Sequence, residues 1–252
     1  MQNITFENIS IPGHVEFENK LYRHYHYPKM LSMYDSNFIE FKVVPSLFEF
    51  KEAAIYLREF HLKKGQTHVK FYFPDNEKLN EKLINYLKEA DYEYGYNELY
   101  AIHPNDFPIV DKHPYVEIKE VTSENLDLFL QLQYEQDLKF GEEFAKEKVG
   151  LHKQHFKDPS VLQLMAFYKG APAGSVDIFI RENTVEIDSL NVLVDHQRKG
   201  IGGRLQQYVM ERFPSKMVIL VADGDDTPRE MYRKQNYTYL GFKYEIQKIY
   251  QE

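Results

Sequence analysis

The sequence predicts an α/β protein with a mixed sheet, divided into two domains. Short apolar segments of strand length alternate with longer segments whose apolar residues recur every three or four positions. The chain has 252 residues, enough for two ordinary domains. A segment with three prolines, from His103 to Pro114, interrupts the alternation. We therefore expect a smaller N-terminal α/β domain over residues 1–112 and a second domain over residues 113–252.

The N-terminal domain is predicted to alternate strands and helices after residue 38. The expected elements are a strand over Phe38–Val44, a helix from Ser46 to about Lys64, a strand over His68–Phe73, a helix over Asn76–Ala90 and a strand over Tyr92–Ile102. Before them, His24 and His26 would alternate on one face of a surface edge strand. Two histidines without a carboxylate at ligand spacing make a poor metal site, so we expect no metal in this protein.

The second domain is predicted to follow the order β α α β β β α β α β β. The expected elements are a strand over Tyr115–Val121, helices over Glu124–Phe140 and Glu142–Phe156, strands over Val161–Tyr168, Ala173–Ile180 and Val185–Val194, a helix over Ile201–Phe213, a strand over Met217–Ala222, a helix capped by Thr227 that ends near Asn236, and two strands over Tyr237–Tyr250. No repeat of fixed short period is present.

Composition limits the class of protein. The chain is 43% hydrophobic and 28% charged, as is usual for soluble globular proteins. Its net charge of −8 argues against general nucleic-acid binding, which needs basic residues. The sequence has no apolar run of about 18 residues, no signal-peptide pattern at Met1 and no cysteine. We therefore expect a cytoplasmic protein with no membrane partner, and a homodimer is left open.

One segment has the layout of a phosphate-binding turn. A strand ends near Val192, the turn contains Gln197, Arg198 and Lys199, and a helix then begins with Gly200-Ile201-Gly202-Gly203. The first N–H groups of a helix have no internal partner and the helix dipole is positive there. Glycines let an anion approach those groups closely. An ordinary strand–helix connection with a basic loop is the alternative.

This segment resembles the GNAT (Gcn5-related N-acetyltransferase) family, which binds acetyl-CoA on a strand, turn and helix of this kind. The matching residues are Leu190-x-Val192, Gln197-Arg198-Lys199-Gly200-Ile201-Gly202 and the later Met231-Tyr232-Arg233-Lys234-Gln235-Asn236-Tyr237. The resemblance covers about residues 115–250. The N-terminal domain would then be a degenerate, GNAT-like unit.

The resemblance implies a donor site for acetyl-CoA. Backbone N–H groups from about Gln197 to Gly203 would hold the pyrophosphate, with the charges of Arg198 and Lys199 beside them. Leu190, Asn191 and Val192 would pair with the pantetheine arm as an added strand does. A bulge near Asn191 is expected to make room for the thioester.

The resemblance also implies catalytic residues. Tyr232 stands at the family's general-acid position, and a core tyrosine is the alternative. Glu186 stands where some members carry a base, and Asp188 lies two residues on, although solvated carboxylates would explain both equally well. In the absence of cysteine, direct attack in a ternary complex is expected rather than an acyl-enzyme.

Several residues depart from the family pattern or lie outside it. Asp225 and Pro228 replace the usual Asn and Ala, and Asp225 would weaken cofactor binding if it lies near the diphosphate or the pantetheine. The acidic loop Asp223–Asp226 would attract a cationic amine, or it is a solvated turn. His152 and His155 could contact substrate, but we expect them to be surface residues.

Two functions follow from these residues. The first is transfer of an acetyl group from acetyl-CoA to a primary amine of a small molecule or peptide. The second is an acyl-CoA-binding sensor or scaffold without chemistry. The acceptor is not encoded in a recognisable motif, since the fold accommodates many acceptors.

Overall fold

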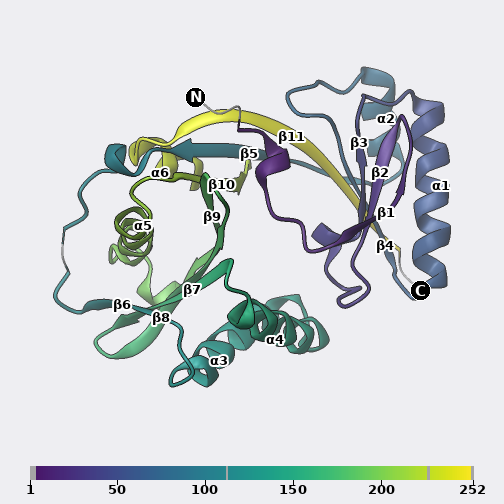
Figure 1. Ribbon diagram of the computed structural model, residues 1–252. Coiled ribbons are helices and arrows are strands. Elements are labelled where there is room, and N and C mark those ends of the chain that lie inside the picture. Colours follow the sequence, from purple (N-terminus) through teal and green to yellow (C-terminus); the bar gives the residue numbers. More distant parts are fainter. Residues whose placement is uncertain (1–3, 112, 226–227, 251–252) are drawn as a thin grey trace. The chain divides into compact units, whose positions relative to one another are not determined.

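The computed structural model describes residues 4–111, 113–225 and 228–250 (Figure 1). It is a mixed α/β structure, as the sequence predicts, and it divides into two compact units. The first combines the residues up to Leu99 with 222–229 and the residues from Leu240 onward. The second combines Tyr100–Val221 with Glu230–Tyr239. Each unit is discontinuous in sequence, and the expected boundary at residues 112 and 113 stays a prediction, with Lys112 outside the described residues.

The first unit is a mixed sheet with two helices on one face. Parallel pairing joins β3 to β4, and antiparallel pairing joins β1 to β2, β2 to β3 and β4 to β11. One buried apolar cluster unites both helices with the sheet, so both cover the same face. The elements are β1 (His14–Glu18), β2 (Tyr22–His26), β3 (Phe38–Phe41), β4 (His68–Tyr72), β5 (Glu93–Ile102), β11 (Thr238–Ile249), α1 (Leu47–Lys63) and α2 (Glu81–Glu89).

Local side-chain chemistry sets where the helices of this unit begin. Ser46 and Glu49 form a reciprocal capping box at the start of α1, which confirms the predicted helix. The second helix begins at Glu81, not at Asn76 as predicted. Asn76 adopts a left-handed φ of 62°, and Asn80 caps the helix by accepting a hydrogen bond from the Leu83 N–H.

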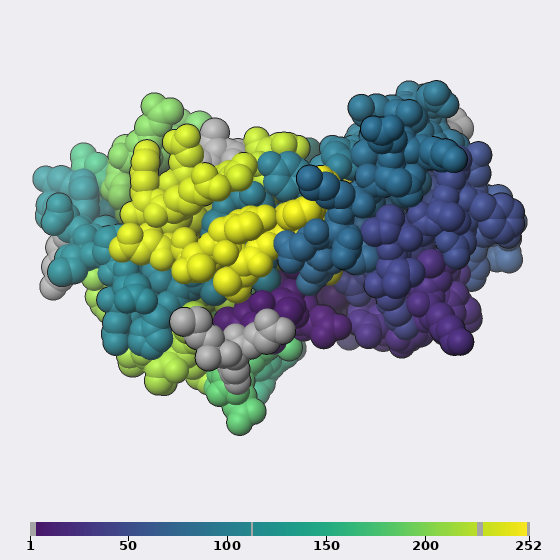
Figure 2. All heavy atoms as spheres, turned by 90° about the horizontal axis from the view of Figure 1, so that it is seen from above, coloured from purple at the N-terminus to yellow at the C-terminus, as the bar shows by residue number. Residues whose placement is uncertain are grey.

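Two expectations for this unit are wrong. The strand that carries His24 and His26 is not at a surface edge, because β2 lies between β1 and β3 and both side chains are buried. The segment after Tyr237 is one strand, β11, instead of two. Its first residues Thr238, Tyr239 and Leu240 are exposed, and the yellow atoms of this strand form part of the surface in Figure 2.

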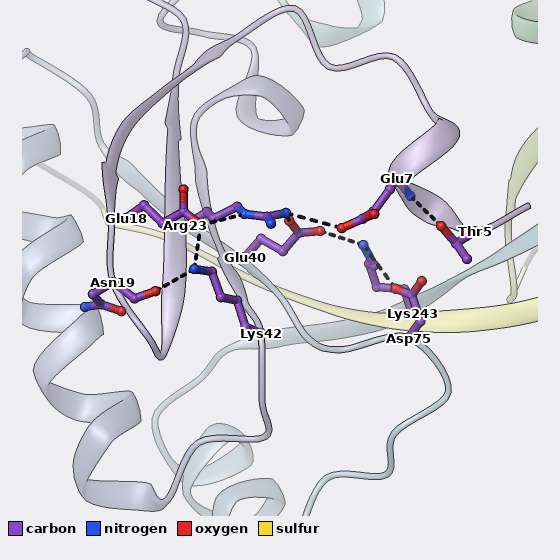
Figure 3. Close-up of polar contacts among 9 residues, drawn as sticks. All are labelled: Thr5, Glu7, Glu18, Asn19, Arg23, Glu40, Lys42, Asp75 and Lys243. Carbon is purple, nitrogen blue, oxygen red and sulfur yellow. Dashed lines mark hydrogen bonds and ion pairs between the residues drawn. The ribbon is translucent and has the colours of Figure 1, made fainter.

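Charged side chains connect β11 with the N-terminal strands (Figure 3). Lys243 Nζ lies 2.6 Å from a Glu40 carboxylate oxygen and 3.2 Å from one of Asp75. Arg23 Nε donates to Glu18 over 3.1 Å, and the Arg23 guanidinium also approaches Glu7 and Glu40. Since Lys243 and Glu40 are mostly buried, these contacts are screened little by solvent and hold the late strand to residues far away in sequence.

The second unit carries a sheet in the order β10-β9-β8-β7-β6. Parallel pairing joins β9 to β10 and antiparallel pairing joins the others. In Figure 1, α5 lies on one side of these strands and α3 and α4 lie on the other. The elements are β6 (Val116–Glu120), α3 (Leu126–Asp137), α4 (Glu142–Lys157), β7 (Val161–Tyr168), β8 (Ala171–Ile180), β9 (Thr184–Val192), α5 (Ile201–Arg212), β10 (Met217–Asp223) and α6 (Pro228–Lys234).

The predicted helix at Ile201 packs as its apolar pattern indicates. Ile201, Leu205 and Val209 recur at steps of four and are fully buried or nearly so. Helix α6 ends as predicted, since Asn236 follows it with a left-handed φ of 66°. The predicted cap Thr227 lies outside the described residues. In the described parts of the chain, no helix is both long and apolar enough to cross a membrane.

Candidate functional site: a bulged strand, a turn and the start of a helix

Strand β9 contains an extra residue near its carboxyl end. Ser175 of β8 pairs with Asn191, but Asp177, two residues on, pairs with Asp188, three residues back. Ser189 accommodates the extra residue with a left-handed φ of 51°. The expected bulge is therefore present, and it begins two residues before Asn191.

The two parallel strands of this unit are paired over a short stretch. Among the described residues, the ladder between β9 and β10 runs from Thr184 opposite Met217 to Glu186 opposite Ile219. Beyond it, β9 continues to pair with β8 as far as Val192 opposite Gly174. The bulged part of β9 thus has a sheet partner on its β8 side, and its ladder with β10 has already ended.

Gly174 allows the bulged strand to approach β8 closely. A Cβ atom at this position would lie 2.5 Å from the Asn191 carbonyl oxygen and 3.2 Å from the Val192 Cα. Contacts below 3.0 Å with backbone atoms cannot be relieved without moving the strand. The absence of a side chain at Gly174 therefore sets the position of the predicted pantetheine-binding residues.

The turn after β9 leads into α5 through two residues with left-handed backbone. Arg198 has a φ of 60° and Gly200, the N-cap, a φ of 76°. Within the described part of the chain no side chain caps this helix, and its first internal hydrogen bond runs from the Arg204 N–H to the Gly200 carbonyl. The N–H groups of the residues between them, Ile201, Gly202 and Gly203, therefore have no acceptor inside the helix.

The predicted residues of the strand and the helix are neighbours in space. A Cβ atom on Gly202 would lie 3.8 Å from methyl carbons of Leu190 and Val192. The Gln197 side-chain amide donates to the Val192 carbonyl over 3.3 Å and joins the turn to the strand. The structure therefore brings the end of β9 and the first turn of α5 together.

The two basic residues of the turn differ in their surroundings. Lys199 Nζ donates to the Asp195 carbonyl over 2.6 Å and lies 4.7 Å from the centre of the Tyr168 ring. Arg198 is exposed to solvent. Arg198 can therefore contact a ligand directly, whereas Lys199 would first have to give up its hydrogen bond to the Asp195 carbonyl.

Tyr232 lies among other tyrosines. Its ring centre is 5.6 Å from that of Tyr100 and 5.5 Å from that of Tyr237, and its side chain is 8% exposed. The Tyr237 hydroxyl donates to the Gln206 side chain of α5 over 2.9 Å. Burial, followed by the charge of Tyr232, raises the pKa of Tyr237 well above its ordinary value. These contacts connect the Tyr232 segment to α5.

The two candidate bases lie on one face of the sheet. Glu186 pairs with Phe179 and Asp188 with Asp177, and directly paired residues point to the same side. Glu186 is 5% exposed. Burial raises the pKa of Asp188, opposed by the charge of Lys148 and supported by that of Asp177. A carboxylate with a raised pKa is a stronger base than an ordinary aspartate.

Asp225 is exposed in the turn after β10, where its N–H donates to the Asp223 side chain over 2.9 Å. It belongs to the first compact unit, whereas the bulge, the turn and Tyr232 belong to the second. Its predicted role beside the cofactor stays a prediction. The acidic loop is described only as far as Asp225.

With this geometry established, comparison with known proteins identifies the second part of the chain. Residues 127–237 match the Acetyltransferase (GNAT) family. The second part of the chain is therefore a GNAT acetyltransferase domain. Residues 4–100 match a different family, described as Domain of unknown function (DUF5613). No curated protein matches the sequence.

Solved structures agree with this assignment of the GNAT fold. A functionally unknown conserved protein from Staphylococcus epidermidis is 33% identical over 98% of both chains, with a TM-score of 0.90. A GCN5-related N-acetyltransferase from Kribbella flavida is 16% identical over 93% of this chain and 89% of its own, with a TM-score of 0.57. A tandem GNAT protein from the clavulanic acid pathway is 9% identical over 84% of this chain and 74% of its own, with a TM-score of 0.51.

The tandem GNAT protein matches more of the chain than residues 113–252 make up. This likeness concerns the fold alone, and the expectation of a degenerate GNAT-like N-terminal unit stays a prediction. Family and fold together support a general acyltransferase, in a family that generally uses acetyl-CoA.

The GNAT domain also contains a polar cluster that sequence reasoning missed. His152 is 1% exposed and His155 15% exposed, so the expectation that they are surface residues is wrong. Both face Asp177 on β8. Residues three apart on a helix share a face, but Asp177 lies 22 residues beyond His155 and no local pattern points to it.

Proposed function

We propose that the GNAT domain transfers an acetyl group from acetyl-CoA to a primary amine of a small molecule or peptide. The observation that carries the proposal is the bulge at Ser189 in β9, next to a turn that opens α5 with uncapped N–H groups. Such N–H groups favour a diphosphate, and an unpaired strand edge favours an extended amide-containing arm.

In the proposed reaction the amine nitrogen attacks the thioester carbonyl directly. A C–N bond forms and the C–S bond breaks, so the sulfur leaves with the electron pair. Tyr232 donates a proton to that sulfur or stabilises its charge. Glu186 or Asp188 takes the proton that the amine loses, through a water molecule.

Donor binding is tested by Gly202→Glu. A carboxylate on the first turn of α5 would repel the diphosphate and occupy its place, so we expect acetyl-CoA affinity to fall by about tenfold or more. Calorimetry with acetyl-CoA measures the change. Gly150→Glu is the matched control, because Gly150 is exposed on α4 with open space around it and its variant should bind normally. Equal affinity in Gly202→Glu and the wild type would refute the donor site.

The general acid is tested by Tyr232→Phe. We expect kcat to fall by about 10²-fold, since proton transfer by a positioned side chain typically contributes this much or more. Acetyl-CoA affinity, measured by calorimetry, should stay unchanged. A variant with unaltered kcat would make Tyr232 a packing residue. A wild-type protein that binds acetyl-CoA but acetylates none of a broad amine panel would favour a sensor or scaffold instead.

The base is tested by the pH dependence of kcat/KM in Glu186→Gln and Asp188→Asn. Because burial raises the pKa of Asp188, an Asp188 base would lose activity on acidification at a pH above the ordinary range of an aspartate. Loss of this acidic limb in Asp188→Asn, and its retention in Glu186→Gln, is the expected pattern for that base. The opposite pattern would assign the role to Glu186.

A further inference from the structure

Helix α4 directs two histidines at a single carboxylate of β8. Asp177 Oδ2 lies 3.1 Å from His155 Nδ1 and 3.3 Å from His152 Nδ1. One ligand atom from each of these three side chains can be chosen so that all lie within 4.8 Å of one another. The contact joins a helix to the centre of a sheet.

The Asp177 carboxylate is deeply buried, and two further aspartates, Asp137 and Asp188, lie within reach of its charge. Its side chain is 2% exposed, and its polar partners are the two histidines and the Gln163 amide, which donates to Oδ1 over 3.3 Å. Among the residues that the structure describes, no lysine or arginine forms an ion pair with Asp177. Burial raises the pKa of Asp137 and of Asp188; the charge of Lys148 lowers both, and the charge of Asp177 raises both. A buried carboxylate requires a compensating positive charge.

The geometry around His152 differs from that of a simple hydrogen bond. Its Nδ1 is buried and makes no hydrogen bond with any described residue, although Asp177 Oδ2 is only 3.3 Å away. Donor atoms that share a tetrahedral zinc ion are separated by about 3.3 Å without pointing at each other, since each bond to the metal is about 2.0–2.2 Å long. The orientation of His152 therefore suits a common cation better than a bond to Asp177.

Further polar groups support the cluster from outside. His152 Nε2 lies 3.3 Å from the side-chain amide of Gln133, which in turn contacts the Ser175 hydroxyl over 2.9 Å. Such partners of ligand side chains orient histidines and carboxylates at metal sites. In this structure the Gln133 side-chain nitrogen faces His152 Nε2, and the Gln133 oxygen accepts from the Ser175 hydroxyl. Ligation through Nδ1 places the proton on His152 Nε2, and turning the Gln133 amide over lets its oxygen accept that proton and its nitrogen donate to the Ser175 oxygen.

We propose that His152, His155 and Asp177 bind a divalent transition-metal ion that fastens α4 to β8. Imidazole nitrogens with one carboxylate oxygen suit Zn²⁺ well, whereas Mg²⁺ and Ca²⁺ prefer oxygen ligands. His155, the most exposed of the three, marks the side from which a water molecule completes the coordination. The ion would stabilise the packing of α4 against this face of the sheet.

The proposal is tested by metal titration of the full chain after treatment with a chelator. We expect one Zn²⁺ per chain by calorimetry and no binding of Mg²⁺. Saturation with Zn²⁺ should raise the melting temperature by about 5 °C or more at a hundredfold excess over Kd. Co²⁺ in place of Zn²⁺ should give the intense visible absorption of a low-coordinate nitrogen–oxygen site.

Variants locate the ion. Asp177→Asn and His155→Gln should each weaken Zn²⁺ binding by about 100-fold, because loss of an outer partner alone costs about 10–100-fold. His14→Ala, at an exposed histidine 3.2 Å from Glu16, is the control and should bind one ion normally. If Asp177→Asn does not fold, His155→Gln at the partly exposed position and the Co²⁺ spectrum decide. Binding of less than half an ion by the wild type, unchanged binding in both variants, or loss of binding in His14→Ala would overturn the proposal.

Discussion

Gly174→Ala is expected to destabilise the GNAT domain and to weaken its binding of acetyl-CoA. The added methyl carbon would lie 2.5 Å from the Asn191 carbonyl oxygen, so β8 and the bulged end of β9 would have to separate. Overpacking of this kind costs about 1–3 kcal/mol in the free energy of unfolding. A shift of Asn191 and Val192 would also displace the strand edge proposed to pair with the pantetheine arm.

Denaturant unfolding followed by tyrosine fluorescence measures the change in stability, because the chain has 20 tyrosines and no tryptophan. Calorimetry measures acetyl-CoA binding in the same variant. Gly150→Ala is the matched control: its added Cβ meets nothing within 4 Å, and alanine in an exposed helix is about 1 kcal/mol more favourable than glycine. Wild-type stability in Gly174→Ala would show that the two strands separate without cost and would contradict the expectation.

The first compact unit is expected to lose stability as the pH falls below about 6.5. His24, His61 and His68 are at most 1% exposed. Burial, followed by the charge of neighbouring His61, lowers the pKa of His24 and of His68 to about 3. Burial lowers the pKa of His61 to about 4, with further lowering by His26 and Arg58 against a hydrogen bond to the His68 carbonyl.

The direction of the effect follows from proton uptake. An unfolded histidine has a pKa of about 6.5, so between pH 6.5 and 4 the unfolded chain binds protons that the folded unit excludes. Stability is complete above pH 6.5 and falls on acidification by about 1.4 kcal/mol per pH unit for each histidine. Because each unfolded histidine is already half protonated at pH 6.5, three such histidines would cost about 3 kcal/mol between pH 6.5 and 5.5.

Hydrogen exchange of β2, α1 and β4 at pH 7 and 5.5, corrected for intrinsic exchange rates, localises the effect to this unit. His68→Gln should reduce the pH dependence by about one proton, whereas His103→Gln, at an exposed position outside the cluster, should leave it unchanged. Equal protection of these elements at the two pH values would show that the buried histidines do not control stability. The lower pH is kept above 5 because ordinary carboxylates take up few protons there and so contribute little to the change in stability.

Most individual elements could be read from the sequence because their causes are local. Ser46 and Glu49 cap α1 from within one turn, and the apolar stripe of Ile201, Leu205 and Val209 is a property of one helix. The strand, turn and helix around Gln197–Gly203 are contiguous, so their motif predicts both fold and donor class. Elements whose limits depend on distant packing were read less well, as with the single strand β11.

The histidines show most clearly that side-chain surroundings cannot be predicted from local sequence. The alternation of His24 and His26 is compatible with an exposed edge strand, because no local pattern indicates that β1 pairs with β2 and takes the edge position itself. His152 and His155 share a helix face in any reading, but only the packing of α4 on β8 supplies Asp177 as their partner. Whether a side chain is buried, and which side chain of another element it contacts, depends on residues far away in sequence.

The sequence by itself determined the α/β class and the GNAT-like strand–turn–helix, and it pointed to Tyr232 as a candidate general acid, because each depends on neighbours within a few turns of chain. Only the tertiary structure decided where the bulge begins and that the close approach of Asn191 leaves no room for a side chain at Gly174. It alone also showed that two histidines and Asp177 form one cluster. The physical reason is that strand register and helix–sheet packing join residues that chain proximity leaves apart.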